Sequence, residues 1–266
     1  MHPRPSRAAL TLAVVASLGT ALGACAPATP APADPTARAD ASPAPPRPTP
    51  TPAAGARVVV TAGDVTLEVT VPGASDDDPR VTVDRDDDAG TAAITFAAAA
   101  LGDDAAGPPR IALTSGGTLA PRPDGSMGVR AGGTATGGLA APRGARLVAV
   151  DDTHLEVRAP AGSDPTGATT VLGTDGVRSA DWGDREGGRS LAVDATAWAR
   201  GAGQAGVDLV WAELVAEDPE VDTTTMHDQL ECHAIGAPGK ATWNLEPWRP
   251  DVGLVATMAA RCNPTS

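Results

Sequence analysis

The stretch ARVVVTAGDVTLEVTV, residues 56–71, decides the fold of the first part of this 266-residue chain. Apolar and polar residues alternate through its second half, and a period of two is typical of a strand that buries one face. Gly63 and Asp64 interrupt the pattern with residue types that favour a tight turn. The stretch therefore predicts a β-hairpin.

Short segments rich in Val, Ile, Leu and Thr continue the pattern, with Gly, Pro and Asp between them. They are RVTVD (80–84), TAAITFA (91–97), RIALT (110–114), ARLVAVDD (145–152) and THLEVRA (153–159). No long helical pattern interrupts them. We expect an all-β domain over residues 57–174, sandwich-like or built of stacked hairpins, and a protease-accessible stretch within 159–176.

The composition changes after residue 177. All five tryptophans lie beyond this point, namely Trp182, Trp198, Trp211, Trp243 and Trp248. VRSADW and GRSLAV read as two strands around a turn at 183–188, and Asp194 as the cap of a following helix. This change predicts a second domain, of the α+β class, over residues 177–264.

Three more helices are expected in this domain. In AGVDLVWAELVAED (205–218), apolar residues recur at helical spacing, and Pro219 should end that helix. A further helix is predicted over 224–234. The last is expected to open at Asp251 and to end at Asn263, with its apolar face, which includes Cys262, turned inward. The predicted fold is an all-β domain followed by a small α+β domain.

The N-terminal segment carries targeting features. Arg4 and Arg7 precede an apolar run over 8–22 that is too short for a good membrane span. The run ends in Leu-Gly-Ala-Cys, which resembles the lipobox of bacterial lipoproteins. That resemblance implies removal of residues 1–24, acylation of Cys25 and attachment to the membrane through lipid. Residues 25–56 are rich in Pro, Ala and Thr and read as an extended tether outside the cytoplasm.

Cysteine usage agrees with an extracytoplasmic location. If Cys25 is acylated, Cys232 and Cys262 remain as an even pair in an oxidising compartment, where a disulfide is the economical assignment. The bridge would close the small α+β domain. The alternative is a nucleophilic Cys232 activated by a histidine.

The charge balance excludes one class of partner. The chain has a net charge of −13 and a single lysine, Lys240. Such a chain is not attracted to phosphates, so we expect no nucleic-acid partner. No phosphate-binding loop or dinucleotide fingerprint occurs, and no cofactor is expected.

Reactive residue types gather in MHDQLECH (226–233). His227 and Glu231 are four apart and share a helix face, with Asp228 beside them. A zinc protease needs two histidines four apart, whereas His227 and His233 are six apart, so no metal site is expected. His233 instead shares an inward stripe with Met226 and Leu230. A secreted hydrolase that uses His227 with Asp228 or Glu231 stays open as an alternative.

The segment WNLEPWRP (243–250) allows two interpretations. Its prolines restrict the backbone, so the tryptophans could lock a rigid loop between the last two helices. Alternatively, the segment could expose an aromatic platform that binds a cell-wall glycan or an envelope protein. The residues of that platform would be Trp243, Asn244, Glu246, Trp248 and Arg249.

Four segments together resemble a known domain: SLAVDATAWAR (190–200), MHDQLECH, ATWNLEPWRPDV (241–252) and RCNP (261–264). The likeness is to a C-terminal domain of secreted and lipid-anchored actinobacterial proteins, a family whose function is unknown. It covers about residues 177–264 and implies no catalytic residue. The sequence thus predicts a cell-envelope lipoprotein that displays a non-enzymatic binding or structural module.

Overall fold

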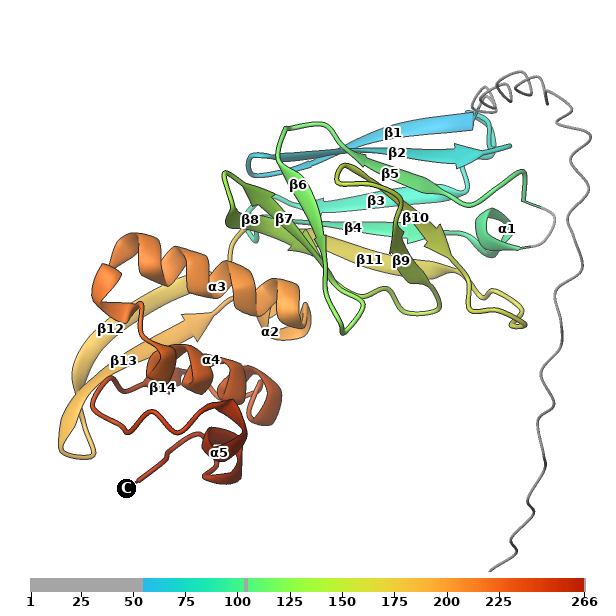
Figure 1. Cartoon of the computed structure of the whole chain (residues 1–266). Coiled ribbons are helices and arrows are strands. Elements are labelled where there is room, and N and C mark those ends of the chain that lie inside the picture. The colour runs from blue at the N-terminus through green and yellow to red at the C-terminus, as the bar shows by residue number, and fades with distance from the viewer. Residues whose placement is uncertain (1–54, 103–104, 266) are drawn as a thin grey trace, which may run out of the picture. The chain divides into compact units, whose positions relative to one another are not determined.

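The computed structural model describes residues 55–102 and 105–265. Cys25 and residues 26–54 of the predicted tether lie outside these ranges, whereas its last two residues, Gly55 and Ala56, begin the first strand. Figure 1 shows two groups of elements in the described part, a β-rich group followed by a group with most of the helices. This arrangement confirms the predicted fold class. None of the described helices is long and apolar enough to span a membrane.

The predicted hairpin forms as expected. Strand β1 (Gly55–Ala62) pairs antiparallel with β2 (Val65–Pro72) through a turn at Gly63 and Asp64. The alternation of β2 places Val65, Leu67 and Val69 in the core. The hairpin belongs to a five-stranded sheet of order β1-β2-β5-β10-β9. Its other strands are β5 (Arg110–Leu113), β9 (Arg146–Ala149) and β10 (His154–Arg158).

A six-stranded antiparallel sheet forms the other layer, in the order β3-β4-β11-β8-β7-β6. Its strands are β3 (Val81–Asp86), β4 (Thr91–Phe96), β6 (Thr118–Pro121), β7 (Met127–Ala131), β8 (Thr134–Leu139) and β11 (Ala168–Gly173), and the one-turn helix α1 (Ala98–Leu101) follows β4. Apolar side chains of both sheets join in one buried cluster, with Leu67 and Ile111 from one sheet and Ile94 and Leu172 from the other. The shared cluster fits the sandwich-like form of the prediction.

The expected protease-accessible stretch is partly wrong. Strand β11 lies inside it and pairs with β4 on one side and β8 on the other. Thr170 and Leu172 of this strand are buried. A strand with neighbours on both sides resists proteolysis, so within this stretch cleavage is expected in the loop over 159–167 rather than in the strand.

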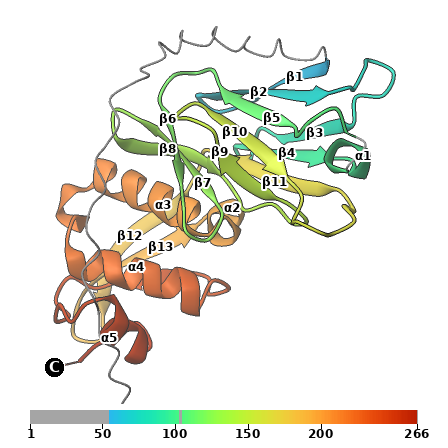
Figure 2. The ribbon, with the colours of Figure 1, turned by 45° about the vertical axis from the view of Figure 1, so that its right-hand side comes forward.

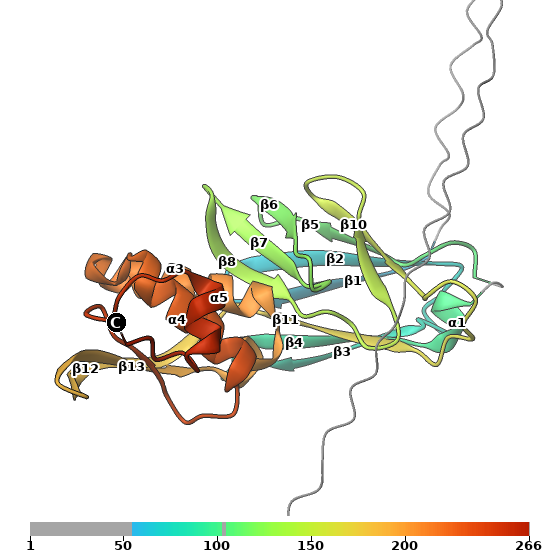
Figure 3. The same ribbon diagram turned by 60° about the horizontal axis from the view of Figure 1, so that its bottom comes forward.

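The helical part contains a three-stranded sheet of order β12-β13-β14. Figure 3 shows helices on one side of its β12–β13 hairpin. The elements are β12 (Val177–Arg185), β13 (Gly188–Ala195), α2 (Ala197–Gly201), α3 (Gln204–Glu217), the 3-10 helix η1 (Pro219–Val221), α4 (Thr224–Gly236), β14 (Trp243–Leu245) and α5 (Leu254–Ala259). A second buried cluster includes Trp243, Leu209 and Met226.

Two local expectations need correction. The turn between β12 and β13 is shorter than 183–188, because pairing continues to Arg185 and Gly188. The cap of α2 is Thr196, whose side chain accepts a hydrogen bond from the backbone N–H of Ala199. Asp194 instead pairs with Arg200 at 3.1 Å. The predicted end of α3 before Pro219 is confirmed.

The last helix is shorter than expected. Gly253 has φ of 77° and precedes α5, whereas Arg261 and Cys262 have φ of 54° and 66°, outside the helical region. Cys262 is therefore not on a helix face, and the expectation of an inward-facing apolar stripe on α5 is wrong. The predicted disulfide is confirmed, with the Cα atoms of Cys232 and Cys262 5.5 Å apart.

The helical part contacts the six-stranded sheet closely, and Figure 2 shows α3 beside β7 and β8. The first turn of α3 is capped from the sheet: Asp124 accepts from the N–H of Gln204 at 2.6 Å, and Ser126 from that of Ala205 at 3.1 Å. A Cβ on Gly138 would lie 2.9 Å from the side chain of Ala205. Glycine is required there because the helix lies so close.

Candidate functional site

Helix α4 carries the predicted reactive residues, but it does not assemble them. The ring of His227 packs edge-on against Trp211, with centroids 4.7 Å apart. Glu231 accepts a hydrogen bond from the side-chain amide of Gln204 at 3.1 Å. Within the described residues, no hydrogen bond joins His227 to Asp228 or Glu231. Among the residues it describes, the structure therefore shows no preformed hydrogen-bonded dyad at His227.

Asp228 follows His227 in the sequence, and the charges of both His227 and Asp251 act on its carboxyl group. It is buried, and burial raises the pKa of its carboxyl group, with the charge of Asp251 adding to the effect and His227 opposing it. Its neighbour one turn later is Cys232, half of the disulfide. Asp228 thus lies close to the disulfide, and no hydrogen bond between its side chain and His227 occurs in the described part of the chain.

His233 and Gln229 cover the free edge of β14. The side-chain amide of Gln229 donates to the carbonyl of Glu246 and accepts from its N–H, both at 3.0 Å. His233 contacts the carbonyl of Asn244 through Nε2 at 3.1 Å, so this nitrogen carries the proton. Burial, helped by the charges of Lys240 and Arg249, lowers the pKa of His233 to about 4. The predicted core role of His233 is confirmed.

Trp243 lies at the centre of the helical part. It is fully buried, and its indole N–H donates to the carbonyl of Ala237 at 3.2 Å. The guanidinium of Arg200 lies 4.8 Å from the ring centroid. Arg200 also donates to the carbonyls of Ala195, Pro238, Lys240 and Ala241. Trp243 and Arg200 thus fix the loop between α4 and β14.

Arg249 ties three segments together. It is buried and pairs with Glu246, which is buried as well. It also donates to Glu186 at 2.6 Å in the β12–β13 turn and to the carbonyl of Pro264 at 3.3 Å near the end of the chain. Its guanidinium lies 4.6 Å from the ring centroid of Trp248. The network has the geometry of a structural clamp.

The aromatic-platform interpretation is therefore wrong for most of its residues. Trp243, Glu246 and Arg249 are buried, and the side-chain oxygen of Asn244 is buried as well. Only Trp248 is exposed, by 43%, and its ring rests against Gly188. The segment WNLEPWRP is a rigid loop, in line with the first of the two interpretations.

Comparison with known proteins places this loop and α4 in one family. Residues 177–265 match the family described as Protein of unknown function (DUF2599). The match confirms the resemblance seen in the sequence. We refer to these residues as the DUF2599 region.

The relatives are mycobacterial proteins, which agrees with the actinobacterial resemblance. Two are uncharacterized proteins of Mycobacterium tuberculosis and Mycobacterium bovis, each 48% identical over 71 residues, which cover 25% of this chain and 48% of the relative. An uncharacterized protein of Mycobacterium leprae is 39% identical over 61 residues, covering 21% of this chain and 50% of its own length. The chain thus spans about half the length of the curated relatives it matches. No solved structure matches it.

The DUF2599 region holds most of the exposed large apolar side chains. Among the described residues seven are exposed, and five of these lie between positions 235 and 258: Ile235, Trp248, Val252, Val255 and Met258. Helix α5 buries only Thr257, and Val255 is 84% exposed. We call Ile235, Leu254, Val255 and Met258 the α5 surface. The sequence alone does not reveal this surface, because the same apolar residues suggest burial.

A groove of about 250 Å³ adjoins the α5 surface. Its apolar lining comes from α2, α3, α4 and α5, namely Ala199, Val207, Ala234, Ile235 and Leu254. Asp124 and Glu231 line it with carboxyl groups. Burial raises the pKa of Asp124, but hydrogen bonds from Ser126 and Gln204 outweigh burial and lower it. Asp124 therefore keeps its negative charge at neutral pH.

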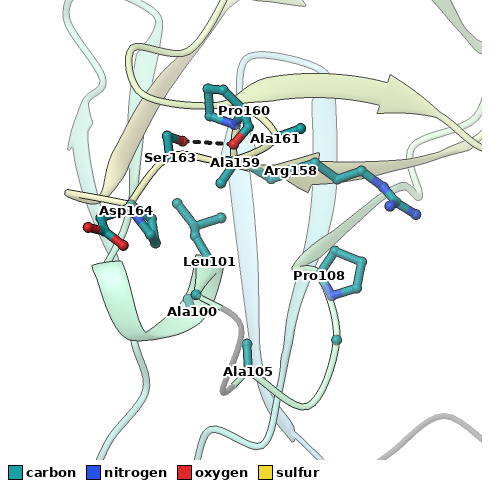
Figure 4. Close-up of a pocket in the computed structure, with 15 residues that line it drawn as sticks. Ala100, Leu101, Ala105, Pro108, Arg158, Ala159, Pro160, Ala161, Ser163 and Asp164 are labelled. Carbon is teal, nitrogen blue, oxygen red and sulfur yellow. Dashed lines mark hydrogen bonds between the residues drawn. The ribbon is translucent and has the colours of Figure 1, made fainter.

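A larger cavity than this groove lies in the β-rich part (Figure 4). It measures about 790 Å³ and lies between α1 and the loop over 159–165. Its lining is mostly Ala, Gly and Pro. Two polar side chains of the lining are engaged locally, since Ser163 donates to the carbonyl of Pro160 at 2.7 Å and Arg158 pairs with Glu156. The cavity offers no pair of groups suited to acid–base chemistry.

In addition, no group of three or more metal-binding side chains occurs in the described ranges.

Proposed function

We propose that this protein is a lipid-anchored component of the cell envelope, whose DUF2599 region binds a partner outside the membrane through the α5 surface. The observation that carries the proposal is the concentration of exposed apolar side chains on and around α5. Contiguous exposed apolar area marks interaction sites in soluble domains, because its contact with water is unfavourable.

The scaffold beneath this surface is rigid. The disulfide joins the segment after α5 to α4, and Thr257 of α5 packs against it, with its carbonyl 3.9 Å from the sulfur of Cys232. The clamp of Arg249 fixes the loop that precedes α5. A surface held in place loses little conformational entropy on binding, which favours affinity.

The polar groups of the region also favour binding over catalysis. Arg200, Gln229, His233 and Arg249 are all engaged with backbone carbonyls or carboxylates. Their hydrogen bonds maintain the loops, and no hydrogen bond orients the His227 side chain within the ranges that the structure describes. The region therefore offers a shaped surface instead of a reactive constellation.

Two features support a location outside the membrane. The lipobox-like segment ends at Cys25, and a disulfide joins the other two cysteines. Disulfides persist in oxidising compartments. Replacement Cys25→Ser should release the protein from the membrane fraction. Retention of the variant in that fraction would contradict the anchor.

Site-specific photo-cross-linking on intact cells tests the binding role. A photoreactive amino acid at Val255 should give a discrete adduct of higher mass. The same amino acid at Val59, an exposed apolar position on β1, serves as the matched control. Equal adducts at both positions, or none at Val255, would refute the proposed surface.

A further inference from the structure

We infer that the α5 surface and its groove receive a cationic amphipathic segment of a partner protein. An apolar side chain of that segment enters the groove, and a basic side chain pairs with Glu231. This inference rests on the proposed binding function and specifies the chemistry of the partner.

The size of the groove limits its occupant. Small-molecule sites usually measure about 300 to 1,000 Å³, and this groove, at about 250 Å³, is smaller. One or two apolar side chains would fill it. Ile235 and Leu254 line the groove and also belong to the α5 surface, so the apolar area is continuous. Such a continuous strip suits the apolar face of a peptide segment.

The charges at the groove select a basic partner. Glu231 and Asp124 present carboxyl groups, whereas the guanidinium of Arg200 is already paired with Asp194 and bonded to backbone carbonyls. Residues 252–260 carry no charged side chain. A segment with apolar residues on one side and Lys or Arg at its border would therefore match both features.

The charge of the whole protein argues against the other occupants. Residues 1–54 hold four arginines and two aspartates, which leaves a net charge of −15 on residues 55–266. A body this acidic is repelled by anionic lipid and by a second copy of itself. In addition, α5 has only six residues, whereas a stable dimer usually buries about 800 Å² on each partner.

Binding of defined probes to the mature chain carrying Cys25→Ser tests the inference. The probes are an amphipathic Leu/Lys peptide, a Leu/Glu peptide of the same apolar pattern, and vesicles with anionic or zwitterionic lipid. We expect the Leu/Lys peptide alone to bind. Glu231→Gln should weaken it roughly fivefold, the size of one partly exposed ion pair. Val255→Asp should abolish binding, since it places a charge on the apolar strip.

Matched variants separate the site from general charge effects. Glu217→Gln removes the same charge from the far end of α3, and Val59→Asp adds one to the exposed face of β1. Both should bind the peptide like the parent. If Glu217→Gln weakens binding as much as Glu231→Gln, attraction is nonspecific and the inference fails. Preferential binding to vesicles, or dimerisation that Val255→Asp abolishes, would also overturn it.

The binding function of the α5 surface and the cationic nature of its partner can be refuted separately. A protein adduct at Val255 in cells, without binding of the Leu/Lys peptide, would leave the binding function standing and refute the cationic partner. Peptide binding that depends on Glu231, without any adduct at Val255, would refute the proposed role in cells.

Discussion

The β-rich part and the DUF2599 region are stabilised in different ways. In the first, one buried cluster of Val, Ile, Leu and Ala extends across two sheets, with Phe96 as its single aromatic residue. In the second, a smaller cluster around Trp243 is supplemented by a disulfide and by buried Arg249 and Glu246. The first spreads its stabilisation over many equivalent contacts, and the second concentrates it in a few groups. Single substitutions should therefore matter more in the second.

Arg249→Ala should give the largest decrease in the free energy of unfolding. It leaves the buried carboxylate of Glu246 without its cation, and breaking one partner of a buried pair costs about 3 to 5 kcal/mol. Urea unfolding followed by tryptophan fluorescence will measure the loss. This signal is selective, because all five tryptophans lie beyond residue 177. Arg189→Ala, which breaks the exposed pair with Glu220, should cost under about 1 kcal/mol. Equal losses would refute the clamp.

Removal of the disulfide should rank next. Cys232 and Cys262 are separated by 30 positions, and closing such a loop stabilises the folded state by about 3 to 4 kcal/mol in the chain-entropy model. Replacing both with serine should lower the urea midpoint of the tryptophan signal and leave the far-UV signal of the β-rich part unchanged. A parallel loss in both signals would show that the two parts unfold as one unit.

Acid should destabilise the DUF2599 region through His233. Its pKa is about 4 when folded and about 6.5 when unfolded, so between these values the unfolded state binds a proton that the folded state does not. The contribution of neutral His233 to the free energy of unfolding is therefore fully present above pH 6.5. It falls by about 3 kcal/mol as the pH drops toward 4. His233→Gln should reduce this slope. An unchanged slope in the variant would assign the acid sensitivity to other groups.

Ile94→Val in the six-stranded sheet should have the smallest effect. Ile94 is fully buried, but the other buried apolar side chains of its cluster keep their contacts with one another. Loss of one methylene therefore costs about 1 kcal/mol. Thermal unfolding followed by far-UV circular dichroism will measure it. A loss as large as that of Arg249→Ala would contradict the contrast between the two parts.

The sequence predicted those strands whose pattern is local. The alternation around Gly63 was enough to place β1 and β2. Strands β8 and β11 were missed because TATGGL and ATTVLG contain glycines that usually weaken strands. Gly138 and Gly173 have a tertiary purpose, since they make room for Ala205 of α3 and for the ring of Trp198. A single sequence does not reveal such neighbours.

The candidate site shows the same limit. The inward stripe of α4 correctly placed His233 in the core, because helical spacing is a local property. The bonds of Arg249 to Glu186 and of Arg200 to Ala241 join residues 63 and 41 positions apart, which spacing cannot predict. The exposure of Val255 was also missed. A six-residue helix in which five residues are apolar suggests burial unless its neighbours are known.

Because Asp124 lines it, the groove is formed by residues of both the β-rich part and the DUF2599 region. Asp124 belongs to the loop between β6 and β7, yet it lines a groove whose other walls come from α2, α3, α4 and α5. A chain that joined the same C-terminal sequence to a different N-terminal domain would keep the apolar wall and lose this carboxylate. Ligand preference could then diverge between relatives through exchange of a single loop, while the tryptophan-centred core stayed unaltered.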